Sequence, residues 1–264
     1  MDAETLQALA DRLPRAPVDL AVIVESLPQM LDGMLLTLEL TAVALAIGFA
    51  ASLGLVMLRL SRNPLLWMPV YGFVFFFRGT PLLVQIFLIY YGSGQFRFEL
   101  MEVGLWAWFR DAYFCAVLTL TLNTAAYTTE ILRGAIRAVP HGEVEAARAC
   151  GMSGALLYRR IILPKAFRFA LPAYSNEVVF LFQATSLVSI ITLMDLTGVA
   201  RTLVSKTFDV YEIYITAGLL YLVVTYGILG LFRWVEHRWS GHLREPPGVG
   251  KRPPDPLAGI ATPT

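Results

Sequence analysis

Charged residues, cysteines and histidines are scarce in this chain, and none of them is arranged for chemistry. Lys, Arg, Asp and Glu together make up 16% of its 264 residues, whereas a soluble domain carries about 25%. Cys115 lies in an apolar run and Cys150 in a polar loop, so no disulfide framework or metal-binding spacing is present. His141, His237 and His242 are scattered, and no catalytic triad or nucleophile elbow accompanies them. We therefore expect no metal site and no catalytic residue, which disfavours a membrane enzyme.

Several motifs are also missing. We expect no secretory signal at the start of the chain, because Asp2 and Glu4 stand where a basic region belongs. A phosphate-binding loop needs Gly, four residues, then Gly-Lys-Ser/Thr, but Gly250-Lys251 is followed by Arg252. We therefore expect no cofactor in this chain and no ATP hydrolysis by it. The net charge of +1 gives no reason to expect nucleic-acid binding.

Long apolar runs are what the chain has instead. Apolar residues make up 56% of it, and the mean hydropathy is +0.61. A chain this apolar buries its surface in lipid or in a very large assembly, and a membrane helix needs roughly 20 mostly apolar residues. We expect an all-α integral membrane protein with five transmembrane helices, at about residues 34–60, 64–91, 113–136, 167–193 and 213–235.

The second of these segments is ambiguous. A cut at Arg78-Gly79-Thr80-Pro81 leaves two pieces that are each too short to span a bilayer. One helix kinked at Pro81 is long enough to cross with tilt, and membrane helices tolerate such a kink when neighbours satisfy the freed carbonyl. We prefer the single helix, which leads to five spans.

Positive charge tests this count, because Lys and Arg collect in short cytoplasmic loops. Arg59 and Arg62 follow the first span without an acid, and the loop after the third span and the tail after the fifth are also basic. The other loops are balanced or acidic, so we expect the N-terminus outside and the C-terminus in the cytoplasm. Residues 1–30 form the expected extracytoplasmic segment, residues 31–243 the transmembrane domain, and residues 244–264, rich in Pro and Gly, a disordered tail.

The longest cytoplasmic loop, residues 140–164, predicts two short helices. Glu143 lies in the first turn of the first helix, where a carboxylate favours the helix dipole. Gly151 is placed as the C-terminal cap of that helix and Ser153 as the N-cap of the next. Pro164 is expected to end the second helix.

Small and apolar side chains give this loop two possible partners. Ala146 and Ala147 would let another protein's backbone approach closely, and Leu156, Leu157 and Ile161 form an apolar stripe. A short helix seated in a partner's groove uses such anchors. An amphipathic helix lying on the membrane surface would use them as well, and the residues alone favour neither alternative.

A resemblance decides between these alternatives. The loop matches, at every fixed position, the EAA loop of ABC importer permeases, whose pattern is Glu-Ala-Ala, three residues, Gly, nine residues, Ile, one residue, Leu-Pro. The resemblance implies a coupling helix that docks into a cleft of the ATPase subunit. The residues that match, and that it assigns to this contact, are Glu145, Ala146, Ala147, Gly151, Ile161, Leu163 and Pro164.

Three further stretches extend the resemblance over about residues 31–243. Residues 76–85 and 122–130 resemble the polar amino-acid uptake permeases, and residues 171–177 resemble the subunits that import histidine, arginine, lysine and ornithine, or opines. This implies the MetI-like, type I ABC permease fold with five core helices in a bacterial inner membrane. It also implies an ATPase dimer that binds ATP, a periplasmic amino-acid-binding protein, and a second permease, for which we favour a relative over a copy.

Polar residues inside the expected spans are candidates for the substrate pathway, because such residues usually face a cavity or one another. A basic amino acid needs a carboxylate for its cation and donors for its own carboxylate. The alternative is that these side chains tie the helices together, which we favour for the pair Glu130 and Arg133, spaced three apart. Gln183, Ser186 and Ser189 are spaced to share one helix face. The pathway candidates are Glu177, Gln183, Ser186, Asn176 and Arg78.

A stand-alone ion-coupled carrier or channel for small solutes is the alternative function. Such a carrier needs its own coupling-ion site and usually shows repeated halves. The sequence shows neither feature.

Overall fold

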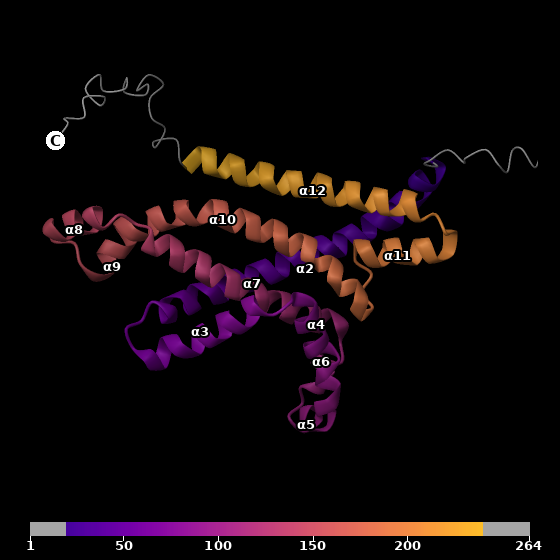
Figure 1. The fold of residues 1–264 in the computed structure, drawn as a ribbon, viewed down its shortest axis with the longest axis horizontal. Helices are drawn as coiled ribbons and strands as arrows, with labels where there is room; N and C mark the ends of the chain where they lie inside the picture. The colour runs from indigo at the N-terminus through magenta and orange to yellow at the C-terminus, as the bar shows by residue number, and fades with distance from the viewer. Residues whose placement is uncertain (1–19, 240–264) are drawn as a thin grey trace, which may run out of the picture.

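The computed structural model describes residues 20–239, and these residues form helices without any strand (Figure 1). The all-α prediction is confirmed, whereas the predictions for residues 1–19 and 244–264 lie outside the described residues. A 3₁₀-helix follows α4 and another follows α10, and a π-helix joins α9 to α10. The α-helices are α2 (Leu20–Arg59), α3 (Pro64–Gly79), α4 (Leu82–Tyr90), α5 (Arg97–Glu102), α6 (Trp106–Phe109), α7 (Ala112–Arg137), α8 (His141–Ala149), α9 (Gly154–Leu157), α10 (Leu163–Ala184), α11 (Leu196–Thr207) and α12 (Val210–Trp239).

The number of membrane-crossing helices differs from the expected five. Three continuous helical stretches are long and apolar enough to cross, and the bent pair that begins with α3 raises the number to four at most. Helix α7 is 26 residues long but too polar to qualify by composition. The reason is its position, since most of its polar side chains face other helices rather than lipid. The count of five spans is therefore not confirmed.

The second expected span is broken rather than kinked. Helix α3 ends at Gly79 and α4 begins at Leu82, and the two parts meet at an angle of 107°. Thr80 has the extended conformation (φ −115°, ψ 145°) that a residue before proline favours, and Pro81 follows it as the N-cap of α4. The prediction of a single helix over residues 64–91 is wrong, because Thr80 leaves the helical region and the chain turns there.

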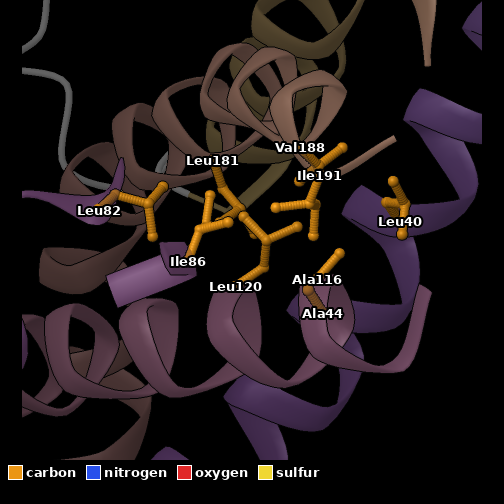
Figure 2. Packing of buried hydrophobic residues seen from close by; sticks show 9 residues of the cluster. All are labelled: Leu40, Ala44, Leu82, Ile86, Ala116, Leu120, Leu181, Val188 and Ile191. Atoms are coloured by element: carbon orange, nitrogen blue, oxygen red, sulfur yellow. The ribbon is translucent and has the colours of Figure 1, made fainter. Parts of the chain in front are cut away.

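Helix α7 is the centre of the bundle and packs against α2, α3, α4 and α10. Figure 2 shows one part of this core, in which α7 meets side chains from α2, α4, α10 and the 3₁₀-helix after it. Helices α2 and α7 approach so closely that a Cβ on Gly48 would lie 2.4 Å from the Thr124 methyl. Because lipid is as apolar as leucine, close packing of this kind holds membrane helices together. The buried residues drawn are Leu40, Ala44, Leu82, Ile86, Ala116, Leu120, Leu181, Val188 and Ile191.

The basic segments gather at one end of the bundle. The turn after α2, the α8–α9 segment and the C-terminal end of α12 lie at the left of Figure 1, and α11 lies at the opposite end. This arrangement brings together the loops that the charge pattern assigns to a single side of the membrane.

Candidate functional site

The first half of the EAA-like loop is a helix closed by a Schellman motif. Helix α8 ends at Ala149, and Gly151 follows with a left-handed φ of +82°. The N–H of Met152 donates to the Ala147 carbonyl at 3.0 Å and the N–H of Gly151 to the Arg148 carbonyl at 2.9 Å, which is the bonding pattern of this motif. The prediction of Gly151 as the C-terminal cap is confirmed, and any other residue there would strain the turn.

The faces of α8 do not match the expected contacts in every case. Glu145 and Ala146 are exposed at the end of the molecule, as a docking surface requires. Ala147 is only 6% exposed, because its methyl packs with Val139 and Leu157 in the protein's own core. Within this chain the Ala147 side chain fixes α8 to the bundle, and its assigned contact with a partner stays a prediction.

The second half of the loop is continuous with the next membrane helix. Helix α9 runs through the π-helix Tyr158–Ile162 into α10, so the prediction that Pro164 ends a helix is wrong. Pro164 lies in the first turn of α10, directly after the π-helix and within one continuous helical stretch. Ser153 occupies the N-cap position of α9, but its side chain makes no capping bond. Leu163 and Pro164 are exposed and Ile161 is half-buried.

Helix α8 is held against the bundle by the packing of Ala147 and by one ion pair. Lys165 at the start of α10 forms an ion pair with Glu143 on α8. A cavity of about 580 Å³ lies between α8 and the ends of α2 and α7, and Glu145, Arg148 and Arg137 line it. A force on α8 can therefore reach α7 and α10 through these contacts. Pi-helices often mark functional sites, and the one described here adjoins α8.

A buried cluster of amides holds the break between α3 and α4. The Gln85 side-chain amide donates to the Phe77 carbonyl at 2.8 Å, to the Thr80 carbonyl at 3.0 Å and to Thr80 Oγ1 at 2.8 Å. Asn123 on α7 donates to Gln85 Oε1 at 3.0 Å. These bonds satisfy carbonyls that the break removes from the helix, which the membrane interior requires. We call Thr80, Gln85 and Asn123 the break cluster. The sequence alone led to no role for the break cluster, although the presence of polar residues within two apolar segments could have indicated it.

A second buried polar group joins α7 to α10, and its α7 member is Thr124, the residue after Asn123. Glu177 on α10 is only 5% exposed and lies beside the Thr124 hydroxyl. Within residues 20–239, neither Glu177 Oε1 nor Thr124 Oγ1 has a hydrogen-bond partner. Arg78 attracts the Glu177 carboxylate electrostatically without forming an ion pair with it in the described chain. We call Glu177 and Thr124 the acid cluster.

The other pathway candidates do not gather around Glu177. Asn176 and Gln183 are exposed on α10, and Ser186 is half-buried. The expected shared face is not confirmed, since Gln183 is exposed, Ser186 is half-buried, and residues 185–191 form a 3₁₀-helix. Ser189 is buried there, and its hydroxyl donates to the Ser186 carbonyl at 2.9 Å.

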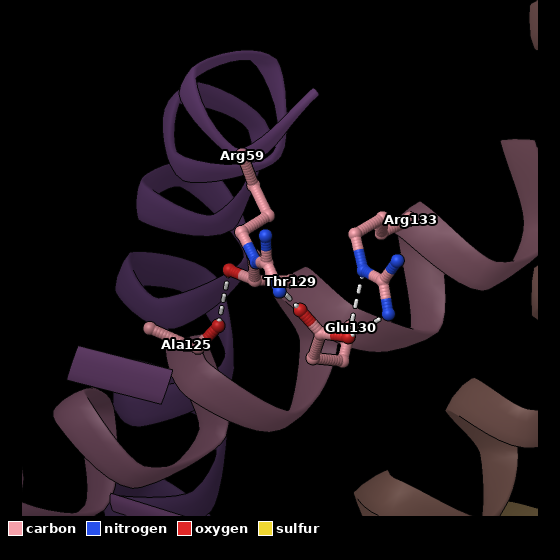
Figure 3. A network of polar contacts seen from close by, with 5 residues as sticks. All are labelled: Arg59, Ala125, Thr129, Glu130 and Arg133. Carbon is pink, nitrogen blue, oxygen red and sulfur yellow. Dashed lines mark hydrogen bonds and ion pairs between the residues drawn. The ribbon is translucent and has the colours of Figure 1, made fainter. Parts of the chain in front are cut away.

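The pair of Glu130 and Arg133 is confirmed and includes a third residue. Glu130 Oε2 accepts from Arg133 Nε at 2.7 Å, and Glu130 Oε1 accepts from Arg59 Nε at 3.2 Å (Figure 3). Arg59 comes from the end of α2, so the carboxylate joins two helices. The sequence analysis missed this contact because residues 59 and 130 lie far apart in the chain. Arg78 lies over the Tyr127 ring, with its Cζ 5.1 Å from the ring centroid.

The model of one protein family matches most of the chain. The family is described as the binding-protein-dependent transport system inner membrane component, and the match covers residues 27–241. The chain is 48% identical to the nopaline transport system permease protein NocM of Agrobacterium fabrum, over 86% of this chain and 94% of that protein. It is 45% identical to the histidine/lysine/arginine/ornithine transport system permease protein HisM of Escherichia coli K12, over 80% of this chain and 89% of that protein.

Solved structures agree with this similarity. A chain of an amino acid ABC transporter, crystallised with histidines, has a TM-score of 0.75 and 34% identity, and the match covers 84% of this chain and 100% of that one. The MetNI methionine ABC transporter in an inward-facing conformation has a TM-score of 0.65 and 20% identity, and the match covers 80% of this chain and 96% of that one. The second likeness concerns the fold alone.

Proposed function

Because this chain belongs to the family of binding-protein-dependent transport system inner membrane components, we propose that it carries basic amino acids or opines into the cytoplasm. It is a membrane-spanning permease subunit of an ABC importer with the MetI-like fold, and it is not itself an enzyme. The substrate class is supported by identities of 48% and 45% to permeases named for nopaline and for histidine, lysine, arginine and ornithine. That likeness over most of both chains is the observation on which the proposal rests.

The family implies an ATPase and a substrate-binding protein as partners, in an inner membrane. Beyond this, we propose an ATPase dimer that binds the ATP, a periplasmic amino-acid-binding protein, and a related second permease rather than a second copy. No cofactor is proposed for this chain itself. We also propose that the N-terminus lies outside and the C-terminus in the cytoplasm, which the gathering of basic segments at one end supports.

The α8–α9 segment is the proposed contact with the ATPase. The exposed Glu145 and Ala146 and the Gly151 turn would form the docking surface, and Ala147 would act by fixing α8 to the bundle. Burial of Leu157 within this chain supports docking over the alternative of a helix lying on the membrane, because it removes one member of the apolar stripe and leaves Leu156 exposed. Ile161, Leu163 and Pro164 would transmit movement into α10, since they lie where the π-helix joins it.

Glu177 is the proposed partner of the substrate's cationic group. A buried carboxylate without a hydrogen bond on Oε1 is costly in a membrane, and a passing cation would compensate it. Because Glu177 is covered in the structure, the substrate would reach it only when α10 moves relative to α7. Asn176, Gln183 and Ser186 would line the approach along α10, and Arg78 would attract the substrate's carboxylate.

Reconstitution of this chain with its partner ATPase, permease and binding protein tests the function. We expect arginine or nopaline uptake that requires ATP and the binding protein. Glu145→Lys and Gly151→Asp should abolish this uptake while leaving membrane insertion intact, because the first reverses a charge on the docking face and the second strains a left-handed turn. Uptake by this chain alone, driven by an ion gradient, would instead establish the carrier alternative.

A matched control separates the effect of backbone strain from the loss of coupling to the ATPase. Gly104 between α5 and α6 also has a positive φ, of +73°, with open space around it. Gly104→Asp therefore introduces comparable backbone strain away from α8. We expect this variant to keep ATP-coupled uptake. Equal losses in the Gly104 and Gly151 variants would contradict the docking role of the α8 turn.

A further inference from the structure

A positively charged cavity lies outside the proposed contacts with the ATPase. It has a volume of about 380 Å³ between α2, α3 and α7, and Arg59, Arg78 and Arg133 line it together with Glu130. Three guanidinium groups line the cavity with one carboxylate, so an excess of one positive charge remains even when Arg78 is set against Glu177. Excess charge of one sign in a half-buried site indicates a ligand of the opposite sign.

The arginines are held in place with donors to spare. Among the described residues, Glu130 accepts hydrogen bonds from Nε of Arg59 and from Nε and one terminal nitrogen of Arg133. The Arg59 guanidinium also lies over the Tyr71 ring, with its Cζ 4.8 Å from the centroid. Each guanidinium has five N–H donors in a planar fork that suits phosphate oxygens. Glu130 thus orients two arginines and leaves part of each fork available.

The surroundings of the cavity suit a lipid rather than a solute. Arg59 is the last residue of α2, at the end of the bundle where the basic segments gather. Helix α3, which forms one wall, exposes large apolar side chains along its length, among them Leu65 at 81% and Phe75 at 68%. Within the described chain nothing covers these side chains, and Phe75 itself lines the cavity. A polar headgroup site beside an apolar wall matches the shape of a phospholipid.

We propose that this cavity binds the phosphate of an anionic phospholipid, with the acyl chains lying along α3. Basic pockets between membrane helices on the cytoplasmic side bind anionic lipid headgroups. The placement in the cytoplasmic leaflet rests on the proposed orientation, whereas the binding itself does not. The lipid joins α2 and α7 to the second half of α3, which ends at the break.

Lipid retention by the assembled importer tests the proposal. The complex is placed in nanodiscs of phosphatidylethanolamine with about a quarter phosphatidylglycerol, released in the gas phase, and weighed by native mass spectrometry. Each arginine near a membrane surface contributes about fivefold to the binding of anionic lipid. We therefore expect Arg59→Gln with Arg133→Gln to reduce phosphatidylglycerol retention about thirtyfold.

Two further variants keep the test independent of folding. Arg62 lies three residues after Arg59, is exposed and does not line the cavity, so Arg62→Gln should retain the lipid. Glu130→Gln breaks the same ion pairs as the double variant but raises the positive charge, so retention should stay equal or rise. A cluster that only ties helices together would lose lipid in both the Glu130 and the arginine variants.

The remaining outcomes overturn the proposal. Equal retention in the wild type and the double variant would do so, as would absence of phosphatidylglycerol from the wild-type importer because a second permease covers α3. Binding of inorganic phosphate by an importer that retains no phosphatidylglycerol would show that a free anion, not a headgroup, occupies the site. The assay uses neither ATP nor substrate, so its failure is distinguishable from a failure of ATP-coupled uptake.

Discussion

The break cluster and the acid cluster begin at adjacent residues of α7 and differ in how far their buried polar groups are paired, although Asn123 Oδ1 in the break cluster also has no hydrogen-bond partner among residues 20–239. Asn123 donates to Gln85, and Gln85 in turn donates to the Phe77 and Thr80 carbonyls at the break. Thr124 lies beside Glu177, yet the hydroxyl and Oε1 of the acid are without hydrogen-bond partners among residues 20–239. Both sites are shielded, since Gln85 is 2% and Glu177 is 5% exposed.

The difference separates a structural role from a functional one. An unpaired polar group in a membrane interior costs several kcal/mol, so it persists only where something compensates it. In the break cluster the compensation is visible, because the side-chain amide replaces lost backbone bonds. In the acid cluster Arg78 attracts the carboxylate without forming an ion pair with it in the described chain, and we infer that a substrate cation completes the compensation during transport.

The largest expected effect is on transport, from Glu177→Gln. The substitution keeps the shape of the side chain and removes its charge. Loss of one partner of a buried charge pair costs about 2–5 kcal/mol, so arginine uptake should fall on the order of a hundredfold. Uptake into proteoliposomes measures this, and the thermal midpoint of the complex should be unchanged or higher. Unaltered uptake would remove the acid cluster from the substrate pathway.

The next largest effect is on stability, from Gln85→Leu. The change leaves the Phe77 and Thr80 carbonyls without the amide that they accept from. Each unsatisfied buried acceptor costs about 1–3 kcal/mol, so a loss of about 2–5 kcal/mol is expected. Denaturant unfolding of the purified importer measures it. A stability equal to that of the wild type would mean that the break holds without the break cluster.

A stability change of the opposite sign is expected from Glu177→Leu. Replacing an unpaired buried acid by an apolar residue of similar size removes a desolvation penalty, so the free energy of unfolding should rise by about 1 kcal/mol or more. The same unfolding assay applies to both leucine variants. If Glu177→Leu destabilised the protein as much as Gln85→Leu, the two clusters would play the same structural role and the comparison would fail.

The smallest effect should come from Thr80→Val, which has nearly the same shape. It removes one acceptor of the Gln85 amide and the donor to the Phe76 carbonyl, whereas Gln85 keeps the Phe77 and Thr80 carbonyls. A loss of about 1 kcal/mol is expected. A loss as large as that of Gln85→Leu would transfer the main role in the break to the Thr80 hydroxyl.

The sequence predicted local features better than contacts between distant segments. The Gly151 cap and the extent of α7 follow from neighbouring residues, and both agree with the structure. The break at Thr80 could not be separated from a kink, because the choice depends on Gln85 and Asn123 meeting across helices. The burial of Ala147 was missed for the same reason, since its neighbour Leu157 belongs to another helix.

The polar character of α7 explains the remaining difference. A helix that faces lipid must be apolar, whereas a helix surrounded by other helices can carry Thr and Asn without exposing them to lipid. The span was predicted at residues 113–136, close to the observed Ala112–Arg137, but its polar residues keep it below the composition of a crossing helix. The burial of Ser189 was not foreseen, because the 3₁₀-helix at Thr185 was not visible in the pattern.

Cysteine crosslinking at adjacent positions of α8 tests the central claim, that this segment docks on an ATPase, most directly. In a Cys150→Ser background, which removes the exposed native thiol, Ala146→Cys and Ala147→Cys are compared in membranes that contain the whole importer. Because Ala146 is exposed and Ala147 is buried in this chain, the account predicts that Ala146→Cys captures the ATPase subunit and Ala147→Cys does not. Failure of Ala146→Cys to capture the ATPase, in membranes where uptake proceeds, would contradict it.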